Sequence, residues 1–129
     1  MHVRTFSIAV CMITLALAAP SACLAQSDAE AAVELRERIA VMIEEARCNN
    51  VVNCRVLGLG SRPCGGPEEY VPYSIWDTQV DEVSSLAAEY NFLREEVNAA
   101  AGTVGTCDVL PKPAVNCVNA RCVTVPSRR

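Results

Sequence analysis

Histidine is almost absent from this chain of 129 residues: the only one is His2. Imidazole is the usual general acid-base group near neutral pH and the commonest metal ligand, so histidine-based catalysis and metal binding are excluded for the rest of the chain. Lysine is equally scarce, with Lys112 alone, and 15 acidic residues outnumber 11 basic ones. An acidic chain is poorly suited to phosphate backbones. We therefore expect no nucleic-acid partner, no metal and no cofactor.

The first 25 residues have the three-part layout of a secretory signal. A short basic start leads into an apolar run over 6–19, and small residues precede Gln26. The run is too short for a stable membrane span. We predict a signal peptide over 1–25, cleaved after Ala25. A single small disulfide-stabilised domain over 26–129 then remains, without a transmembrane span.

Two other interpretations of this segment stay open. It can be an uncleaved anchor helix, or Cys23 can be the lipidated first residue of the exported protein. Against lipidation, Pro20 stands where a lipobox has an aliphatic residue. We expect a periplasmic or secreted protein, with lipid anchoring through Cys23 as the alternative. The mass of the exported protein distinguishes a chain that starts at Gln26 from a diacylated chain that starts at Cys23.

Six cysteines follow the predicted signal at irregular spacing: Cys48, Cys54, Cys64, Cys107, Cys117 and Cys122. No two of them are separated by two residues, which argues against a zinc site and against a redox-active Cys-x-x-Cys pair. In an oxidising compartment such thiols predict three structural disulfides. Fifteen pairings are possible, and the spacing alone selects none.

A first amphipathic helix is predicted over about 28–47. Ser27 and Glu30 have the spacing of a capping box. Behind them, apolar residues recur at steps of three and four, which is typical of a helix with one buried face. These residues are Ala32, Leu35, Ile39, Met42, Ile43 and Ala46. A partner surface is possible, but packing against a second helix of the same domain is the simpler interpretation.

A second helix is predicted over 77–101, with Ser74 or Asp77 as its N-terminal cap and Gly102 as its C-terminal stop. Its apolar residues step by three and four in alternation, which is typical of a helix that lies nearly antiparallel along another. They are Val83, Leu86, Tyr90, Leu93, Val97 and Ala100.

The segment between the helices, 48–75, is rich in glycine and proline, which predicts a long irregular loop containing only short extended pieces. Residues 64–67, Cys-Gly-Gly-Pro, suit a tight turn. We expect a disulfide from Cys54 or Cys64 to brace this loop, because ordering so many irregular residues is costly.

The tail is expected to form a β-hairpin that turns at 118–121. In a two-residue hairpin Cys117 and Cys122 would face each other within disulfide range. The other possibility is that Cys122 pairs with Cys107, and the sequence leaves this choice open. The predicted fold class is mainly α: a two-helix antiparallel hairpin with a disulfide-braced loop and a short C-terminal β-hairpin.

One segment of the chain reads Cys-Gly-Gly-Pro-x-x-Tyr-x-x-Tyr-Ser over 64–74, and an acidic helix and a closing cysteine hairpin follow it. Residues 54–123 thereby resemble a group of small exported bacterial cysteine-rich proteins that share this segment. Many members lack counterparts of Cys48 and Cys117. The resemblance thus implies that these two pair with each other and that the other four cysteines pair among themselves. It supports compartment and architecture and implies no activity.

Tyr70, Tyr73 and Trp76 follow the predicted turn closely, and aromatic side chains on a rigid loop are frequent interface anchors. The first hypothesis is therefore a non-enzymatic exported protein that binds another macromolecule of the envelope or extracellular space through them. They are also three of the five aromatic residues beyond the predicted signal, so a place in the core is the competing interpretation.

A sharper alternative is a protease inhibitor. The segment 55–63 would be a braced loop that presents Leu57, Leu59 or Arg62 to a protease, and its rigidity would favour tight binding. Pro63 directly after Arg62 argues against a substrate-like bond at that position.

The alternative from another class is a small carboxylate-dependent hydrolase, because paired carboxylates hydrolyse glycosides without histidine. Glu68 and Glu69, beside the aromatic residues, are the only candidate pair that we single out. Acidic residues of this density more often keep a small protein soluble, so no catalytic residue is assigned.

Overall fold

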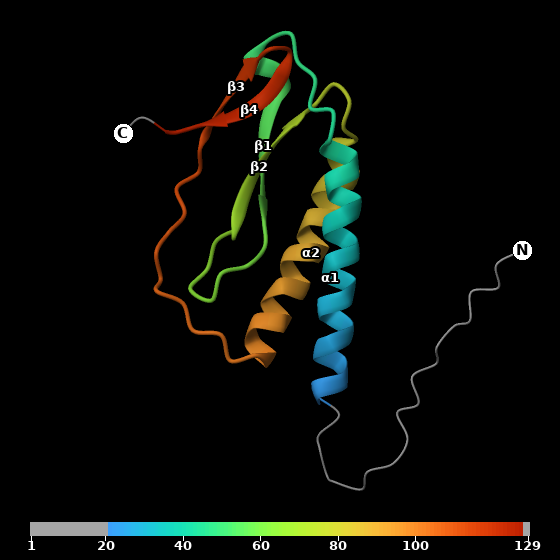
Figure 1. The fold of residues 1–129 in the computed structure, drawn as a ribbon, viewed down its shortest axis with the longest axis vertical. Helices are drawn as coiled ribbons and strands as arrows, with labels where there is room; N and C mark the ends of the chain where they lie inside the picture. Colours follow the sequence, from blue (N-terminus) through green and yellow to red (C-terminus); the bar gives the residue numbers. More distant parts are fainter. Residues whose placement is uncertain (1–20, 128–129) are drawn as a thin grey trace, which may run out of the picture.

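The computed structural model describes residues 21–127. Its elements are α1 (Ser21–Ile43), the 3₁₀ turn η1 (Val51–Asn53), β1 (Cys54–Leu59), β2 (Glu69–Ser74), α2 (Val80–Ala100), β3 (Ala114–Val118) and β4 (Arg121–Val125). The two helices run side by side in opposite directions, and two separate antiparallel hairpins, β1–β2 and β3–β4, lie beside them (Figure 1). No helix in the described part of the chain is both long and apolar enough to cross a membrane.

The predicted signal peptide falls largely on residues 1–20, outside the described residues. Helix α1 begins at Ser21, so Ser27 lies inside it, and the predicted capping box is wrong for the full chain. Its apolar face is confirmed by four buried residues, Ala32, Leu35, Ile39 and Ile43, and Met42 packs against the same core. The predicted end near Arg47 is wrong, because α1 ends at Ile43 and Ala46 lies beyond it in a second core cluster with the cysteines.

The mainly α prediction is wrong, because the segment expected to be a loop forms the β1–β2 hairpin between the two helices. The helices pack against each other, but the β1–β2 hairpin separates them in the sequence, so they do not form a two-helix hairpin. The glycines and prolines of 48–75 were the reason to expect irregular structure, yet two of them, Gly58 and Pro72, lie within strands. A two-stranded sheet consists of edge strands, where proline is tolerated. The fold is therefore an α+β arrangement.

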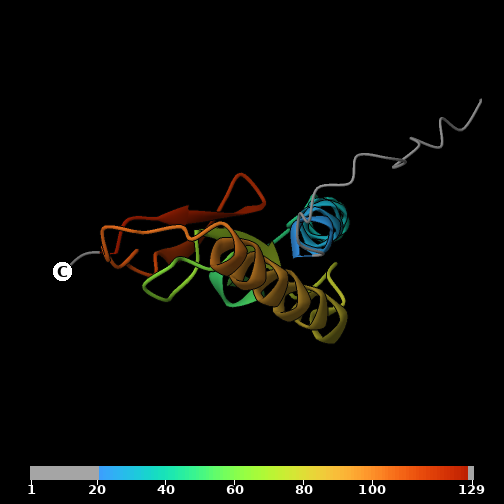
Figure 2. The same ribbon diagram turned by 90° about the horizontal axis from the view of Figure 1, so that it is seen from below.

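The β1–β2 hairpin has two different faces. Leu57, Leu59, Val71 and Tyr73 alternate along one face and pack against the helices, where Leu59 is fully buried together with Ile39 and Val83. The other face carries Cys54, Gly58 and Tyr70 among others, and β3–β4 covers its Cys54 end. Viewed nearly along α1, this helix and β3–β4 lie on opposite sides of α2 and β1–β2 (Figure 2).

Helix α2 buries Val83, Leu86 and Tyr90, as its apolar spacing predicts. It starts at Val80, later than expected. Its N-cap residue is Gln79, whose side chain makes no capping hydrogen bond. Ser74 and Asp77 instead bind the segments around them, so their predicted role as caps is wrong.

Gly102 ends α2 with a positive φ of 61°, as expected. Its amide donates to the Ala99 carbonyl, and the Thr103 amide donates to the Asn98 carbonyl. These two bonds form a Schellman motif, which satisfies carbonyls that the helix end would otherwise leave free.

The tail hairpin is confirmed. Asn119 and Ala120 form its two-residue turn with φ values of 49° and 59°, and Cys117 lies opposite Cys122. Cys117 and Cys122 form a non-hydrogen-bonded cross-strand pair, so their amides do not bond to each other. The amide of Cys122 therefore points out of the hairpin and donates to the Ala46 carbonyl at 2.8 Å.

Both pairings considered for Cys122 are wrong. The disulfides join Cys48 to Cys117, Cys54 to Cys122 and Cys64 to Cys107. The segment after α1 docks on β4 and brings Cys48 and Cys54 beside the hairpin, which the local spacing could not indicate. The Cys48–Cys117 pair agrees with the pairing that the family resemblance implied.

Candidate functional site

The three predicted contact aromatics do not form one cluster. Tyr73 is buried against the helices, and Tyr70 lies on the opposite face of the same hairpin. Trp76 follows β2 and is 59% exposed. Tyr73 therefore belongs to the core, whereas Tyr70 and Trp76 belong to two different surfaces.

A groove of about 600 Å³ opens where β3–β4 leaves the second face of the β1–β2 hairpin uncovered. We call it the Tyr70–Phe92 groove. Its lining combines the end of this hairpin with α2 and with Lys112 from the segment before β3. The residues that matter here are Gly58, Pro67, Tyr70, Asn91, Phe92 and Lys112.

Phe92 is 59% exposed although it stands on a regular helix. The buried face of α2 passes through Tyr90 and Leu93, so a residue between them points away from the core. The position of Phe92 between two residues of the apolar spacing, Tyr90 and Leu93, is visible in the sequence and could have identified it as a surface aromatic residue. The sequence analysis did not single it out.

Tyr70 stands opposite Gly58 across the hairpin. A Cβ atom on Gly58 would lie 3.4 Å from the Tyr70 ring and 3.2 Å from Pro67, so these two rings fill the space above the glycine. Cover of a strand glycine by an aromatic side chain on the neighbouring strand stabilises a hairpin. One wall of the groove is therefore held in place by local packing.

Asn91 fastens β1 to α2 at the edge of the groove. Its Oδ1 accepts from the Gly60 amide at 2.7 Å, and its Nδ2 donates to the Gly58 carbonyl at 3.3 Å. A single amide side chain thus satisfies a donor and an acceptor of the strand edge, as a neighbouring strand would. The position of Phe92, the next residue, is fixed relative to β1 by the same contact.

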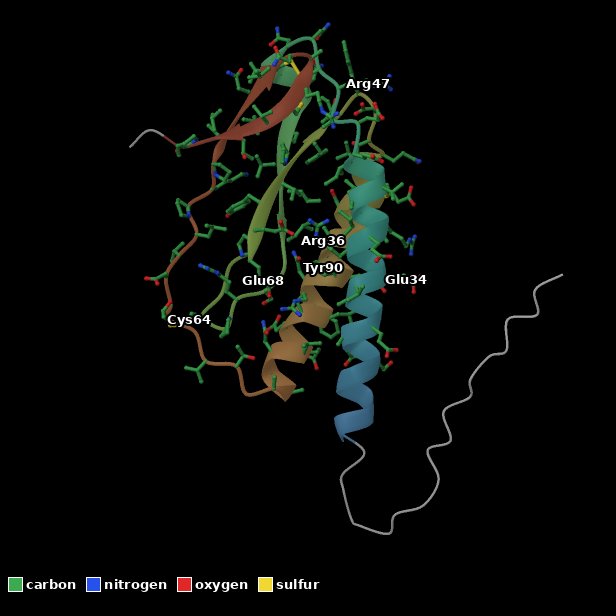
Figure 3. The ribbon with its side chains drawn as sticks, in the orientation of Figure 1. Glu34, Arg36, Arg47, Cys64, Glu68 and Tyr90 are labelled. Atoms are coloured by element: carbon green, nitrogen blue, oxygen red, sulfur yellow. A yellow bond between two sulfur atoms is a disulfide. The ribbon has the colours of Figure 1, made fainter. Side chains whose placement is uncertain are left out.

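Glu68 and Glu69, the candidate hydrolase pair, bind two different arginines. Arg94 of α2 holds Oε1 of Glu68 at 2.8 Å, and Arg36 of α1 holds Oε1 of Glu69 at 2.9 Å. Figure 3 shows Glu68, Arg36 and Tyr90 between the hairpin and the helices. These ion pairs join the start of β2 to α1 and the residue before β2 to α2, and the arrangement gives the hydrolase alternative no support.

Tyr90 lies within this group of charges and is 9% exposed. Burial raises the pKa of its hydroxyl above the ordinary value, and the negative charge of Glu68 raises it further. The phenol is therefore neutral at physiological pH and serves as an amphipathic core residue.

The segment proposed as an inhibitor loop is largely a strand. Residues 55–59 belong to β1, where Leu59 is fully buried and Leu57 faces the core. Arg62 does lie in the connection to β2, but its guanidinium donates to the Asp108 carbonyl. The expectation that the segment presents Leu57 or Leu59 on an exposed loop is wrong.

One group of potential metal-ligating atoms occurs among the described residues. The Sγ atoms of Cys48, Cys54 and Cys122 lie within 4.8 Å of one another. All three cysteines are in disulfides and therefore offer no thiolate. Their proximity reflects two neighbouring disulfides that cross-link β3–β4 to the segments before and within β1.

Comparison of the chain with protein-family models, with curated proteins and with solved structures finds no match.

Proposed function

We propose that this small disulfide-stabilised protein is exported to the periplasm or secreted, catalyses no reaction, and binds an extended segment of a partner protein in the Tyr70–Phe92 groove. Three disulfides support the compartment, because such bonds persist in oxidising environments. The observation that carries the binding proposal is the presence of two aromatic rings from two rigid elements in one open groove.

The exposure of Phe92 supports binding at this place. Aromatic residues dominate interface energetics because they bury a large area with few rotatable bonds. Tyr70 is held over Gly58, and Asn91 fixes the helix turn that carries Phe92. Because the groove is built in advance, a partner segment would lose little affinity to the ordering of this protein.

The groove chemistry favours a peptide as the occupant. Gly66 lines it with open space around its α-carbon, and a glycine in such a turn lets another backbone approach closely. Glu95 and Lys112 add one charge of each sign at the lining. A polyanion would meet no excess of positive charge there, whereas an extended peptide with apolar side chains could use both aromatic rings.

Phe92→Ser tests the proposal against a matched control, Trp76→Ser. Both side chains are 59% exposed, but only Phe92 lines the groove. We expect equal thermal stability for the two variants. We also expect binding of the native partner to fall about tenfold or more for Phe92→Ser alone, as for a hot-spot aromatic residue.

The partner is identified first by a photoreactive phenylalanine analogue at position 92, with the same analogue at position 76 as the control. A cross-link from 92 to an extended segment of a protein, absent from 76, supports the proposal. Partner binding that survives Phe92→Ser unchanged, or that is lost with Trp76→Ser, would contradict it.

A further inference from the structure

The three disulfides differ in their exposure to solvent. Cys48, Cys54 and Cys122 are at most 4% exposed, so each of two disulfides has at least one buried end. Cys64 and Cys107, in contrast, are both exposed residues. Cys117 is partly exposed, but its partner Cys48 is buried. Because thiol–disulfide exchange requires access of a thiolate to sulfur, the third disulfide, exposed at both ends, is the most open to attack.

The exposed disulfide fastens one segment, residues 103–113, which we call the strap. The strap has no helix or strand and runs from the end of α2 along the β1–β2 connection to β3 (Figure 1). Arg62 donates a hydrogen bond to the Asp108 carbonyl, and Gly105 passes beside Pro63. Among the described residues, no backbone–backbone hydrogen bond holds the strap over 104–113.

Backbone conformation marks the same bond as a point of stored strain. Cys107 has a φ of 57°, in the left-handed region that residues with a Cβ atom adopt at an energetic cost. Such a conformation persists only where its surroundings enforce it, and the link to Cys64 is the covalent constraint at this position. Cleavage of the bond lets Cys107 return to an ordinary conformation.

The strap also supplies part of the groove. Lys112, near its C-terminal end, lines the Tyr70–Phe92 groove together with α2 and the hairpin. A second cavity of about 320 Å³ lies under the strap between Arg62, Arg94 and Cys107. Release of the strap would therefore free Lys112 from the groove lining, while the two less exposed disulfides keep β3–β4 in place.

We propose that Cys64–Cys107 is a reducible latch that holds the strap, and with it Lys112, at the groove, so that its reduction weakens partner binding; this regulation rests on the proposed function. A dithiol reductant attacks one sulfur and forms a mixed disulfide, and its second thiolate resolves it. Cys64 and Cys107 become thiols as the dithiol becomes a disulfide, so two electrons and two protons are transferred.

The first test reduces the native protein with limiting dithiothreitol, alkylates free thiols and maps them by mass spectrometry. We expect Cys64 and Cys107 to be labelled while the other four cysteines stay paired. Thermolysin cleavage before Val104, Val109 or Leu110 should become about tenfold or more faster, while amide exchange in α2 and β4 stays unchanged, because local opening affects only the released segment.

A second measurement reports on the groove without a partner. Phe92 and Phe6 are the only phenylalanines, so incorporation of 4-fluorophenylalanine gives a ¹⁹F resonance for Phe92, assigned with Phe92→Leu. Limiting dithiothreitol should shift this resonance in the wild-type protein. The C64S/C107S variant should already show the shifted resonance and should not respond to the reductant.

Labelling of any of the other four cysteines before Cys64 and Cys107, or together with them, would overturn the latch. An unchanged rate of thermolysin cleavage in the strap, or an unchanged ¹⁹F resonance, after selective reduction would also overturn it. Neither measurement uses the partner. Unchanged partner binding by Phe92→Ser would therefore refute the binding proposal without bearing on the latch.

Discussion

The backbone amide and the guanidinium Nε of Arg47 bind the same carboxylate oxygen, Oδ2 of Asp77, at 3.0 and 3.2 Å. This contact joins the segment that follows α1 to the segment that precedes α2. Asp77 was expected to cap a helix, but its side chain instead holds together the two connections that flank the β1–β2 hairpin. Through this carboxylate the chain just after α1 is tied to the chain just before α2.

Asp77→Asn tests the contribution of this charge. Burial raises the pKa of the Asp77 carboxyl, but hydrogen bonds from Arg47, with a further contribution from Ser74, outweigh burial and hold the pKa below its usual 3.8. The charged form therefore stabilises the fold above the unfolded-state pKa, and this stabilisation is lost as the pH falls through the folded-state pKa. We expect the variant to lose about 1–2 kcal/mol at pH 7.

Denaturant unfolding of the wild-type protein and Asp77→Asn between pH 7 and pH 2 measures this difference, which should shrink below about pH 4. Glu45→Gln is the control, because Glu45 lies 3.9 Å from the Arg47 Nε but both side chains are largely exposed. Its cost should stay below about 0.5 kcal/mol. A difference between wild type and Asp77→Asn that does not change with pH would contradict this role of the charge.

Asn91→Ala should destabilise the protein by about 1–3 kcal/mol, because it leaves the amide of the buried Gly60 without a partner. Glu89→Ala, at an exposed position of the same helix, should stay within about 0.5 kcal/mol of wild type. Unfolding free energies from chemical denaturation give both values. Equal stability of the two variants would show that Asn91 does not fasten β1 to α2.

Gly60→Ala and Gly65→Ala separate backbone strain from steric overlap. Both glycines have positive φ, 85° and 92°. A Cβ atom on Gly60 would lie 2.6 Å from the Glu68 carboxyl carbon, whereas one on Gly65 would meet nothing within 4 Å. We expect a loss of about 1 kcal/mol for Gly65→Ala and a clearly larger loss for Gly60→Ala, measured by chemical denaturation. The reverse order would contradict the packing around Glu68.

Removal of the buried disulfide should cost more than removal of the exposed one. The Cys54–Cys122 and Cys64–Cys107 pairs close segments of 68 and 43 residues. Loop entropy alone separates them by only about 0.4 kcal/mol. The C54A/C122A variant also leaves a cavity in the second core cluster, so we expect it to unfold at a clearly lower denaturant concentration than C64A/C107A. Equal midpoints would show that packing around Cys54 contributes little.

The helices could be predicted because their buried residues recur regularly, from Ala32 to Ile43 and from Val83 to Tyr90. The tail hairpin could be predicted because Asn119 marks a local turn. The β1–β2 hairpin could not, because the positions of Gly58 and Pro72 depend on the folded sheet: it has two strands in the described part of the chain, and the rings of Pro67 and Tyr70 pack over Gly58.

The candidate site was predictable only in part. Tyr70 was singled out because it follows the Cys64–Pro67 turn, but a separation of three residues places Tyr73 on the opposite face of a strand. Phe92, Asn91 and Lys112 reach the groove from elements far away in the sequence. Their convergence depends on how α2 and the strap pack, which a single sequence does not specify.

The central claim is that three specific disulfides join the hairpins and the strap, and peptide mapping of the unreduced protein tests it most directly. Trypsin is insufficient, because Cys48 and Cys54 share one tryptic peptide, and so do Cys107 and Cys117, as Pro113 follows Lys112. A second digestion with thermolysin cuts before Val51 and Val109 and separates them. We predict the links Cys48–Cys117, Cys54–Cys122 and Cys64–Cys107. A Cys117–Cys122 link, or six free thiols in protein recovered from an oxidising compartment, would contradict the account.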